Sequence, residues 1–350
     1  MAYRIGLIGN RAHQNSFGPV WHSRSDCEIV AAAEHNIEKG RALTDLYGVD
    51  VVTDYDAVLN DPDVDIVSIC TDFYLKRPLI QKAVANGKHV LVDKPLGRTA
   101  TEAQEIFDAV SASNSKLVVA YPLRFMPAMI RLKQAIDSGE FGHVVAYAHN
   151  SVKQFDGDLM TYVSYPTPMR QNGGGELMNL GSHAVDYLYW LFGLPNRVMC
   201  RMHNVYFEEY KAFGSEDIAT LWCEYDEMVA TLTLGRSIAK DKSVEADAIN
   251  VTGNGISAQI TRKSLVVNGD PIAVEPPPQT MVAPCVQHLI DCIENDVEPL
   301  TGIHNGLAVM QMKMAAYQSA QSGQIVEFPL KDVNHPLIDV SEQTLDILLD

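Results

Sequence analysis

Short apolar runs alternate with amphipathic stretches along the first 120 or so residues. The apolar runs lie at 3–9, 28–34, 65–71, 89–92 and 117–120. Such near-continuous apolar runs are typical of strands buried on both faces of a parallel sheet. Amphipathic helices are predicted at 76–88 and 101–113, the second preceded by a capping box of Thr99 and Glu102. This alternation predicts a doubly wound α/β domain.

The pattern changes after about residue 123. A helix is predicted over 127–138, and longer strand patterns follow at 144–152, 197–207, 218–225, 229–234 and 248–251. Hairpin turns are predicted at 226–227, 253–255 and 268–269, and helices at about 280–295 and 304–322, with Gly323 as a C-terminal cap. We therefore expect a second, α+β domain with a largely antiparallel sheet. The predicted boundaries are 1–122 and 123–330, with the tail 331–350 unassigned.

Composition narrows the class of protein. A chain of 350 residues suits two domains, and a formal net charge of −17 disfavours nucleic acid and anionic membranes as partners. No run approaches the roughly 20 apolar residues of a membrane span, and the chain enters a strand pattern at once, without a signal peptide. Six scattered cysteines without a CxxC pair favour a cytoplasmic protein with no metal site. The expected partner is a small molecule.

The first candidate site is the turn after the first strand, Gly9-Asn10-Arg11-Ala12. A dinucleotide fingerprint has glycines here that let the backbone approach a pyrophosphate, but Arg11 stands at the middle glycine position. Glu34 closes the second apolar run, where a carboxylate accepts hydrogen bonds from both ribose hydroxyls and repels a 2′-phosphate. This favours NAD over NADP. The alternatives are an ordinary βα turn and an exposed glutamate.

The second candidate is Lys94, which follows a buried strand and precedes Pro95. Ligands of doubly wound sheets bind at this edge, where an ammonium could hydrogen-bond a substrate hydroxyl. A solvated loop lysine is the alternative.

The third candidate is the segment from Gly173-Gly174-Gly175 to Asp186. Three glycines allow the backbone to approach either a ligand or another segment. If the run is helical, Asn179 and His183 share one face, and Asp186 could orient the imidazole of His183 as a general acid/base. The alternative is a helix whose His183 merely packs.

Together these elements resemble the glucose–fructose oxidoreductase / inositol dehydrogenase (Gfo/Idh/MocA) family from Tyr3 to about Leu330. Further stretches that fit are 71–73, 87–95, 121–127, 132–142 and 291–328. The resemblance implies a Rossmann domain followed by an open-faced sheet domain, a tightly held nicotinamide cofactor and a polyhydroxylated substrate. It implies that Thr71, Asp72, Asp93 and Lys94 contribute to cofactor binding. Three positions depart from the family pattern: Arg11 for a glycine, Asp93 for a glutamate and Asn179 for an aspartate.

We therefore expect an NAD-dependent oxidoreductase acting on a hydroxyl-bearing carbon of a sugar, glycoside or cyclitol. His183 would take the hydroxyl proton, Lys94 would hold the reacting oxygen and Asn179 would fix a neighbouring hydroxyl. Candidates to line the sugar site are Arg124 and the loop 154–170, including Tyr162 and Tyr165. Two other classes remain open: a non-catalytic dinucleotide-binding sensor, and an enzyme that uses NAD transiently to activate a sugar for elimination or transfer.

Assembly is predicted from the second sheet. Alternation in 229–234 puts Val229, Thr231 and Thr233 on one face and Ala230, Leu232 and Leu234 on the other. An uncovered sheet face needs cover, so we expect a homodimer or homotetramer joined sheet to sheet, as in the family.

Overall fold

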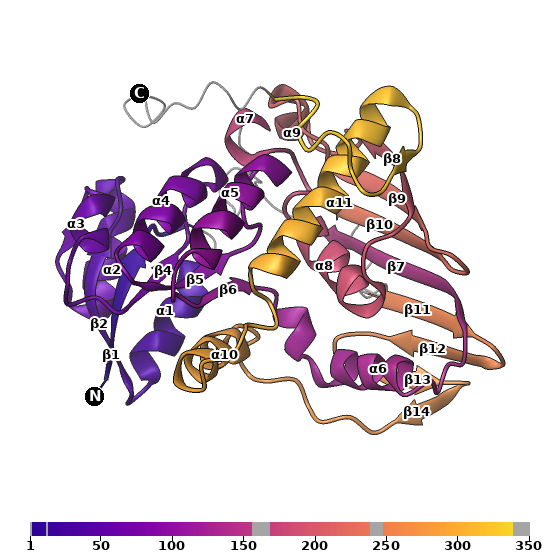
Figure 1. Cartoon of the computed structure of the whole chain (residues 1–350), viewed down its shortest axis with the longest axis horizontal. Helices are drawn as coiled ribbons and strands as arrows, with labels where there is room; N and C mark the ends of the chain where they lie inside the picture. The colour runs from indigo at the N-terminus through magenta and orange to yellow at the C-terminus, as the bar shows by residue number, and fades with distance from the viewer. Residues whose placement is uncertain (1, 12, 156–168, 239–247, 339–350) are drawn as a thin grey trace.

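Two sheets organise the chain in the computed structural model, which describes residues 2–11, 13–155, 169–238 and 248–338. The first sheet has six parallel strands in the order β3-β2-β1-β4-β5-β6 (Figure 1). Its strands are β1 (Tyr3–Ile8), β2 (Cys27–Ala33), β3 (Val51–Val52), β4 (Ile66–Ile69), β5 (His89–Asp93) and β6 (Leu117–Ala120). Its helices are α1 (Gln14–Ser23), α2 (Ile37–Tyr47), α3 (Tyr55–Leu59), α4 (Phe73–Ala85) and α5 (Ala100–Ser111). The predicted doubly wound domain is confirmed.

The central strands of this sheet end together at one edge. Every residue of β4 and β6 is buried, as the continuous apolar runs require. Ile8 pairs with Ile69, Ile69 with Val92 and Asp93 with Ala120, so the turns that follow these strands lie side by side. This carboxyl edge positions the candidate site.

The second sheet has nine strands in the order β14-β13-β12-β11-β7-β10-β9-β8-β15. Among the described strands of this second sheet, only β7 and β10 pair in parallel, which confirms a largely antiparallel sheet. The strands are β7 (Val144–Gln154), β8 (Arg197–His203), β9 (Ile218–Glu224), β10 (Val229–Ser237), β11 (Ala248–Gly253), β12 (Ile256–Ile260), β13 (Leu265–Val267), β14 (Asp270–Ile272) and β15 (Val326–Glu327). The helical elements are η1 (Pro122–Phe125), α6 (Pro127–Asp137), α7 (Met169–Asn172), α8 (Gly181–Phe192), α9 (Glu208–Ala212), α10 (Ala283–Glu294) and α11 (Ile303–Ser322).

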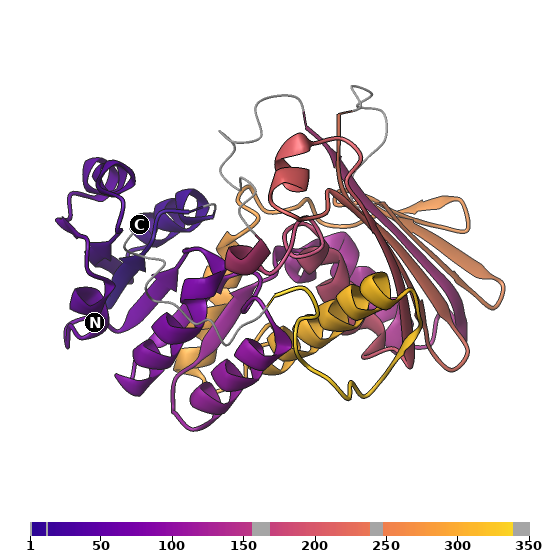
Figure 2. The same ribbon diagram turned by 90° about the horizontal axis from the view of Figure 1, so that it is seen from above.

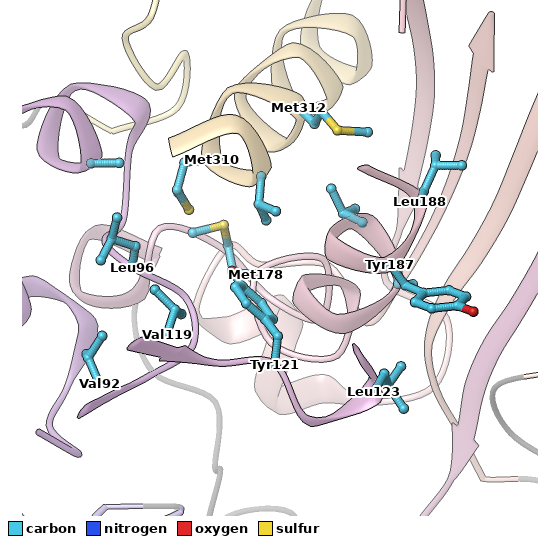
Figure 3. Packing of buried hydrophobic residues seen from close by; sticks show 14 of the residues in the cluster. Val92, Leu96, Val119, Tyr121, Leu123, Met178, Tyr187, Leu188, Met310 and Met312 are labelled. Carbon is cyan, nitrogen blue, oxygen red and sulfur yellow. The ribbon is translucent and has the colours of Figure 1, made fainter. Parts of the chain in front are cut away.

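Helices cover one face of the large sheet. In the described part of the chain, α6, α8 and α11 lie between this sheet and the first domain, while the opposite face carries no helix (Figure 2). Helix α11 contacts α5, α8 and β8, so it joins the two halves. Figure 3 shows the shared core, in which Val92 and Val119 of the first sheet approach Met178 and Met310.

The structure departs from the predicted elements at several points. Helix α1 was not identified because Gly18 and Pro19 lower its helix propensity. Strand β8 ends at His203 rather than at residue 207. Helix α10 packs in one hydrophobic cluster with β1 and β2, so it returns to the first sheet although it lies within the predicted second domain.

Part of the unassigned tail has a defined place. His335 is buried, its ring lies 4.6 Å from that of Tyr317 on α11, and its Nε2 donates to the carbonyl of Gly173 at 2.7 Å. Among the described residues, no helix is both long enough and apolar enough to cross a membrane.

Candidate active site

The turn after β1 brings backbone against backbone at the carboxyl edge. Gly9 has a φ of +79°, and a Cβ there would lie 2.6 Å from the carbonyl oxygen of Cys70, which follows β4. The amide of Arg11 donates to the same carbonyl at 3.0 Å. Gly9 therefore holds a conformation and a close approach that favour glycine.

Glu34 is held beside this turn, immediately after β2. Its side chain is almost fully buried, and its two oxygens accept from the amides of Asn10 at 2.6 Å and Asn36 at 2.9 Å. A buried carboxylate whose charge is stabilised by two amides is a fixed acceptor at the edge where a dinucleotide ribose would lie. The residues thus fit the adenosine half of a dinucleotide.

Arg11 occupies the middle position of the turn as a buried cation. It forms an ion pair with Asp72 and lies over the ring of Phe73, with the guanidinium carbon 5.8 Å from the ring centre. Thr71 is buried as well, and its hydroxyl donates to the carbonyl of Asp72 at 3.2 Å. The structure therefore brings Arg11, Thr71 and Asp72 together, and their part in binding a cofactor stays a prediction.

Asp93 is connected to this turn by a residue that sequence reasoning missed. His13 Nδ1 lies 2.7 Å from Asp93 Oδ1, and the Asp93 side chain is almost fully buried. Burial opposes ionisation of Asp93, but His13, Lys76 and Lys94 outweigh burial and lower the pKa of this carboxyl below its ordinary value. An Asp–His pair linking two turns has no local sequence signal, because its members are 80 residues apart.

Lys76 is a second missed residue. It is fully buried on α4, and its ammonium donates to the carbonyl of Asp93 and to that of Pro95 at 2.9 Å. Burial lowers the pKa of Lys76 to about 8. The two carbonyls flank Lys94, so Lys76 fixes the backbone that carries the candidate catalytic lysine.

Lys94 points at the segment after the glycines. Its Nζ donates to the side-chain oxygen of Asn179 at 2.7 Å and to the Asn179 carbonyl at 3.0 Å. Burial lowers the pKa of Lys94 from its ordinary value. The solvated-lysine alternative is therefore wrong, because this side chain is almost fully buried.

His183 lies in the first turn of α8 and approaches the same edge. Its ring meets that of Tyr121, which follows β6, edge to face at 6.4 Å. The shared helix face of Asn179 and His183 was expected only if the whole run is helical, and α8 begins at Gly181, so Asn179 lies before the helix. Asn179 and His183 nonetheless belong to one continuous segment of the chain. Asn179 contacts Lys94, and His183 contacts Tyr121.

Asp186 does not have the expected role of orienting His183. Its carboxylate accepts from Arg124 at 2.7 Å and from the amide of Asn305. Arg124 is almost fully buried and also donates to the carbonyl of Leu300 at 3.0 Å. All three guanidinium nitrogens of Arg124 donate to these core acceptors, so none is directed toward a sugar site. We therefore correct both expectations and assign Arg124 and Asp186 to the core.

The three glycines approach other segments of the chain. A Cβ on Gly173 would lie 2.6 Å from the carbonyl of Arg98, one on Gly174 would overlap the Tyr317 hydroxyl, and one on Gly175 would overlap the carbonyl of Glu216. Of the two alternatives left open by the sequence, close packing against the chain itself explains these glycines.

Glu176 is the third residue that sequence reasoning missed. It is fully buried and accepts from Arg236 of β10 at 2.7 Å and from the hydroxyl of Tyr210. The amide nitrogen of Asn179 lies 3.3 and 3.5 Å from its two oxygens. A buried carboxylate with three donors was not visible in the sequence, because two of them come from distant segments.

Some predicted residues cannot be placed. Ala12, Tyr162 and Tyr165 lie outside the described residues, as does most of the loop 154–170. Among the residues that the structure describes, no group of three or more His, Cys, Asp or Glu side chains could hold a metal ion.

Two profiles of one protein family match the chain. The profile described as "Oxidoreductase family, NAD-binding Rossmann fold" matches residues 3–121, and the GFO/IDH/MocA C-terminal domain matches residues 129–259. Their boundary falls between the two sheets.

Similar proteins cover this chain to different extents. Levoglucosan dehydrogenase of Pseudarthrobacter phenanthrenivorans is 27% identical over 198 residues, which are 54% of this chain and 51% of that relative. scyllo-Inositol 2-dehydrogenase (NAD(+)) of Bacillus subtilis is 25% identical, covering 78% of this chain and 80% of the relative. A solved levoglucosan dehydrogenase in complex with NADH and levoglucosan superposes with a TM-score of 0.81 at 18% identity, over 94% of this chain and 100% of that chain. That likeness establishes the fold.

Proposed function

Since this chain belongs to the GFO/IDH/MocA oxidoreductase family, we propose that it is an NAD-dependent dehydrogenase of a sugar, glycoside or cyclitol. The observation that carries the proposal is the buried contact between Lys94 and Asn179 at the carboxyl edge of the first sheet. It places an ammonium where ligands of doubly wound sheets bind, with His183 in the segment that follows.

Cofactor binding is assigned to the turn after β1 and its neighbours. Gly9, Asn10, Arg11 and Ala12 would hold the pyrophosphate, with Arg11 as a cation for it, and Glu34 would bind the ribose hydroxyls. Bound NAD would supply the acceptor for a hydride. The carboxylate of Glu34 supports NAD over NADP because it would repel a 2′-phosphate.

The residues around Lys94 would divide the remaining work. His183 takes the hydroxyl proton, since imidazole exchanges protons near neutral pH. Lys94 donates a hydrogen bond to the same oxygen and stabilises the negative charge that develops on it. Asn179 holds Lys94 in place, in addition to the hydroxyl-positioning role expected from the sequence.

The substrate class rests on the relatives. Levoglucosan and inositol, in the names of two of them, are polyhydroxylated rings. Tyr162 and Tyr165 remain predictions for the sugar site, whereas Arg124 belongs to the core and not to that site.

Assembly and location complete the proposal. The uncovered face of the large sheet supports a homodimer or homotetramer joined through it, because Val229 and Thr231 are exposed there. The six cysteines are buried and free, which supports a cytoplasmic location.

Absorbance at 340 nm tests the proposal. The purified protein is incubated with NAD and a panel of inositols, hexoses, anhydrosugars and glycosides. Net NADH formation supports a dehydrogenase. Turnover of a glycoside without net NADH would instead identify transient use of NAD, and dinucleotide binding with no turnover would identify a sensor.

A further inference from the structure

A chain of hydrogen bonds runs from Lys94 into the second domain. Lys94 donates to the Asn179 side-chain oxygen at 2.7 Å, and the Asn179 amide nitrogen faces Glu176 at 3.3 and 3.5 Å. Arg236 donates to Glu176 at 2.7 Å. This series of hydrogen bonds thus runs from a cation to an amide, an anion and a second cation, which come from three separate segments of the protein.

The chemistry of Lys94 and Glu176, on either side of Asn179, allows one orientation of the Asn179 side-chain amide. An ammonium has only donors and an ionised carboxylate has only acceptors. The oxygen of Asn179 must therefore face Lys94, and its nitrogen must face Glu176. Rotating the amide by 180° would set oxygen against carboxylate and nitrogen against ammonium, losing both contacts.

Glu176 is a buried charge that the core stabilises. Its side chain is fully buried, and Arg236 and Tyr210 donate to it from β10 and α9. Its charge acts on Lys94, raising the pKa of that ammonium against the larger effect of burial. A carboxylate at this depth is costly unless it is matched by nearby donors and cations.

Other ionisable groups around Lys94 come from several elements. Besides Glu176, the charged groups that interact with Lys94 are Asp93 from β5, Arg11 from the turn after β1, Arg236 from β10, Lys76 from α4 and Lys313 from α11. His183, from α8, is the further titratable group that we assign to the same site. Asp93 is paired with His13, and its backbone carbonyl accepts from Lys76. Glu176 is therefore the acidic group that acts on Lys94 through Asn179, whose side chain contacts both residues.

We infer that Glu176 is a positioning residue for the proposed reaction: through the Asn179 amide it orients Lys94 and supplies the negative charge that matches it. This inference rests on the proposed function of Lys94. Two of the three N–H bonds of the ammonium are directed to Asn179, so the third is left for a substrate oxygen. Asn179 itself is uncharged, and the carboxylate lies one residue further along this series of hydrogen bonds.

The test is a double-mutant cycle of Glu176→Gln and Asn179→Asp in the full-length protein. Glu176→Gln should lower kcat between about ten- and a hundredfold, the range for misplaced catalytic groups. It should also move the alkaline limb of the kcat profile to lower pH, because Lys94 loses an opposite charge. Adding Asn179→Asp to Glu176→Gln returns one carboxylate beside Lys94. The double variant should recover most of kcat and return the alkaline limb to its original pH.

Tyr210→Phe is the matched control. It removes one hydrogen bond to Glu176 but leaves the charge of the carboxylate, so the alkaline limb should stay in place. If Glu176 only stabilised the fold, Tyr210→Phe and Glu176→Gln would both lower protein stability and neither would move that limb.

Thermal unfolding across pH 4–9 gives a readout that does not need a substrate. In Asn179→Asp alone two carboxylates become neighbours and share a proton, which raises the pKa of the pair above its value in the unfolded chain. The stability of that variant should fall, relative to the unsubstituted protein, as pH rises through this raised pKa, and the double variant should lose this dependence.

Each outcome decides one of the two proposals. If no sugar is oxidised by any variant, the proposed function fails, while non-additive unfolding still supports the network. If Glu176→Gln leaves the alkaline limb unmoved, or if the double variant is no better than Glu176→Gln, Glu176 does not act through Asn179 on Lys94. Additive unfolding at every pH would also overturn the inference.

Discussion

Proton transfer is proposed for His183 and charge stabilisation for Lys94. His183→Ala should lower kcat by about 10²–10⁴-fold and remove the near-neutral limb of its pH profile. Lys94→Ala should lower kcat by about 10²–10³-fold and keep that limb. The profiles are measured with saturating NAD, and both variants should still bind NAD by calorimetry. A limb that disappears in Lys94→Ala but remains in His183→Ala would reverse the two roles.

Single side chains at the carboxyl edge were predictable where a local pattern fixes their place. Gly9 and Lys94 each follow a buried strand, so the sequence alone placed both at the edge. Partners were not predictable when they are far apart in sequence. Lys94 and Asn179 are separated by 85 residues, and Arg124 and Asp186 by 62, so no local pattern assigned the first pair to the site and the second to the core.

Cofactor choice is assigned to Glu34. In Glu34→Ser the loss of hydrogen bonds to a charged acceptor, about 1.5–3 kcal/mol, should lower kcat/KM for NAD by roughly ten- to a hundredfold. The preference for NAD over NADP should narrow, because the repelling charge is gone. Steady-state kinetics with both cofactors measure this, with Glu38→Ser on the exposed surface of α2 as the control. Equal efficiency with both cofactors in the unsubstituted protein would refute the assignment.

At the scale of elements, strands were predicted better than short helices. Strands β4 and β6 combine apolar runs with full burial, whereas α1 contains Gly18 and Pro19 and is held by its contacts with the sheet and α10. The tail had no periodic pattern. The place of its described residues, 331–338, depends on His335, which contacts Tyr317 and the first of the three glycines.

Docking of the tail should depend on pH. Burial lowers the pKa of His335 from 6.5 to about 4, and its Nδ1 must stay unprotonated because it accepts from the Leu337 amide at 3.1 Å. The unfolded chain therefore takes up a proton at a higher pH than the folded chain. The stability that His335 contributes is present above pH 6.5 and is lost as pH falls toward 4.

Denaturant unfolding at pH 7 and pH 4.5 measures this loss. A shift of this size corresponds to about 3 kcal/mol at most. His335→Gln should reduce the difference in unfolding free energy between the two pH values, whereas His22→Gln, at an exposed site on α1, should not. An unchanged difference in His335→Gln would show that another group causes it.

At the scale of the whole molecule, the sequence predicted two sheets but not how helices are shared between them. Helix α10 follows β14 of the second sheet in the chain and packs on the first sheet, and α11 contacts both halves. The positions of α10 and α11 depend on tertiary packing, which the hydrophobic periodicity of the sequence does not encode. The alternation of 229–234 was predicted correctly, since Ala230, Leu232 and Leu234 are fully buried and Val229 is 37% exposed.

The uncovered sheet face should form the contact between copies. Thr231 pairs with Ala148 on one side and with Trp222 on the other, so it lies near the middle of this face. Thr231→Arg should turn an oligomer into a monomer at micromolar concentration, because it buries an unpaired charge in the interface. Light scattering after gel filtration measures the mass, with Gln104→Arg on the exposed surface of α5 as the control. A monomeric unsubstituted protein would contradict the proposed assembly.

Hydride transfer from a ring carbon to NAD is the central claim, and deuterium transfer tests it most directly. The substrate with the highest rate in the panel is prepared with deuterium on each hydroxyl-bearing carbon in turn, and the NADH formed is analysed by mass spectrometry. One labelled position should give NADH one mass unit heavier and a slower rate, whereas the others give ordinary NADH. Unlabelled NADH from every position, or no NADH from any compound in the panel, would contradict the account.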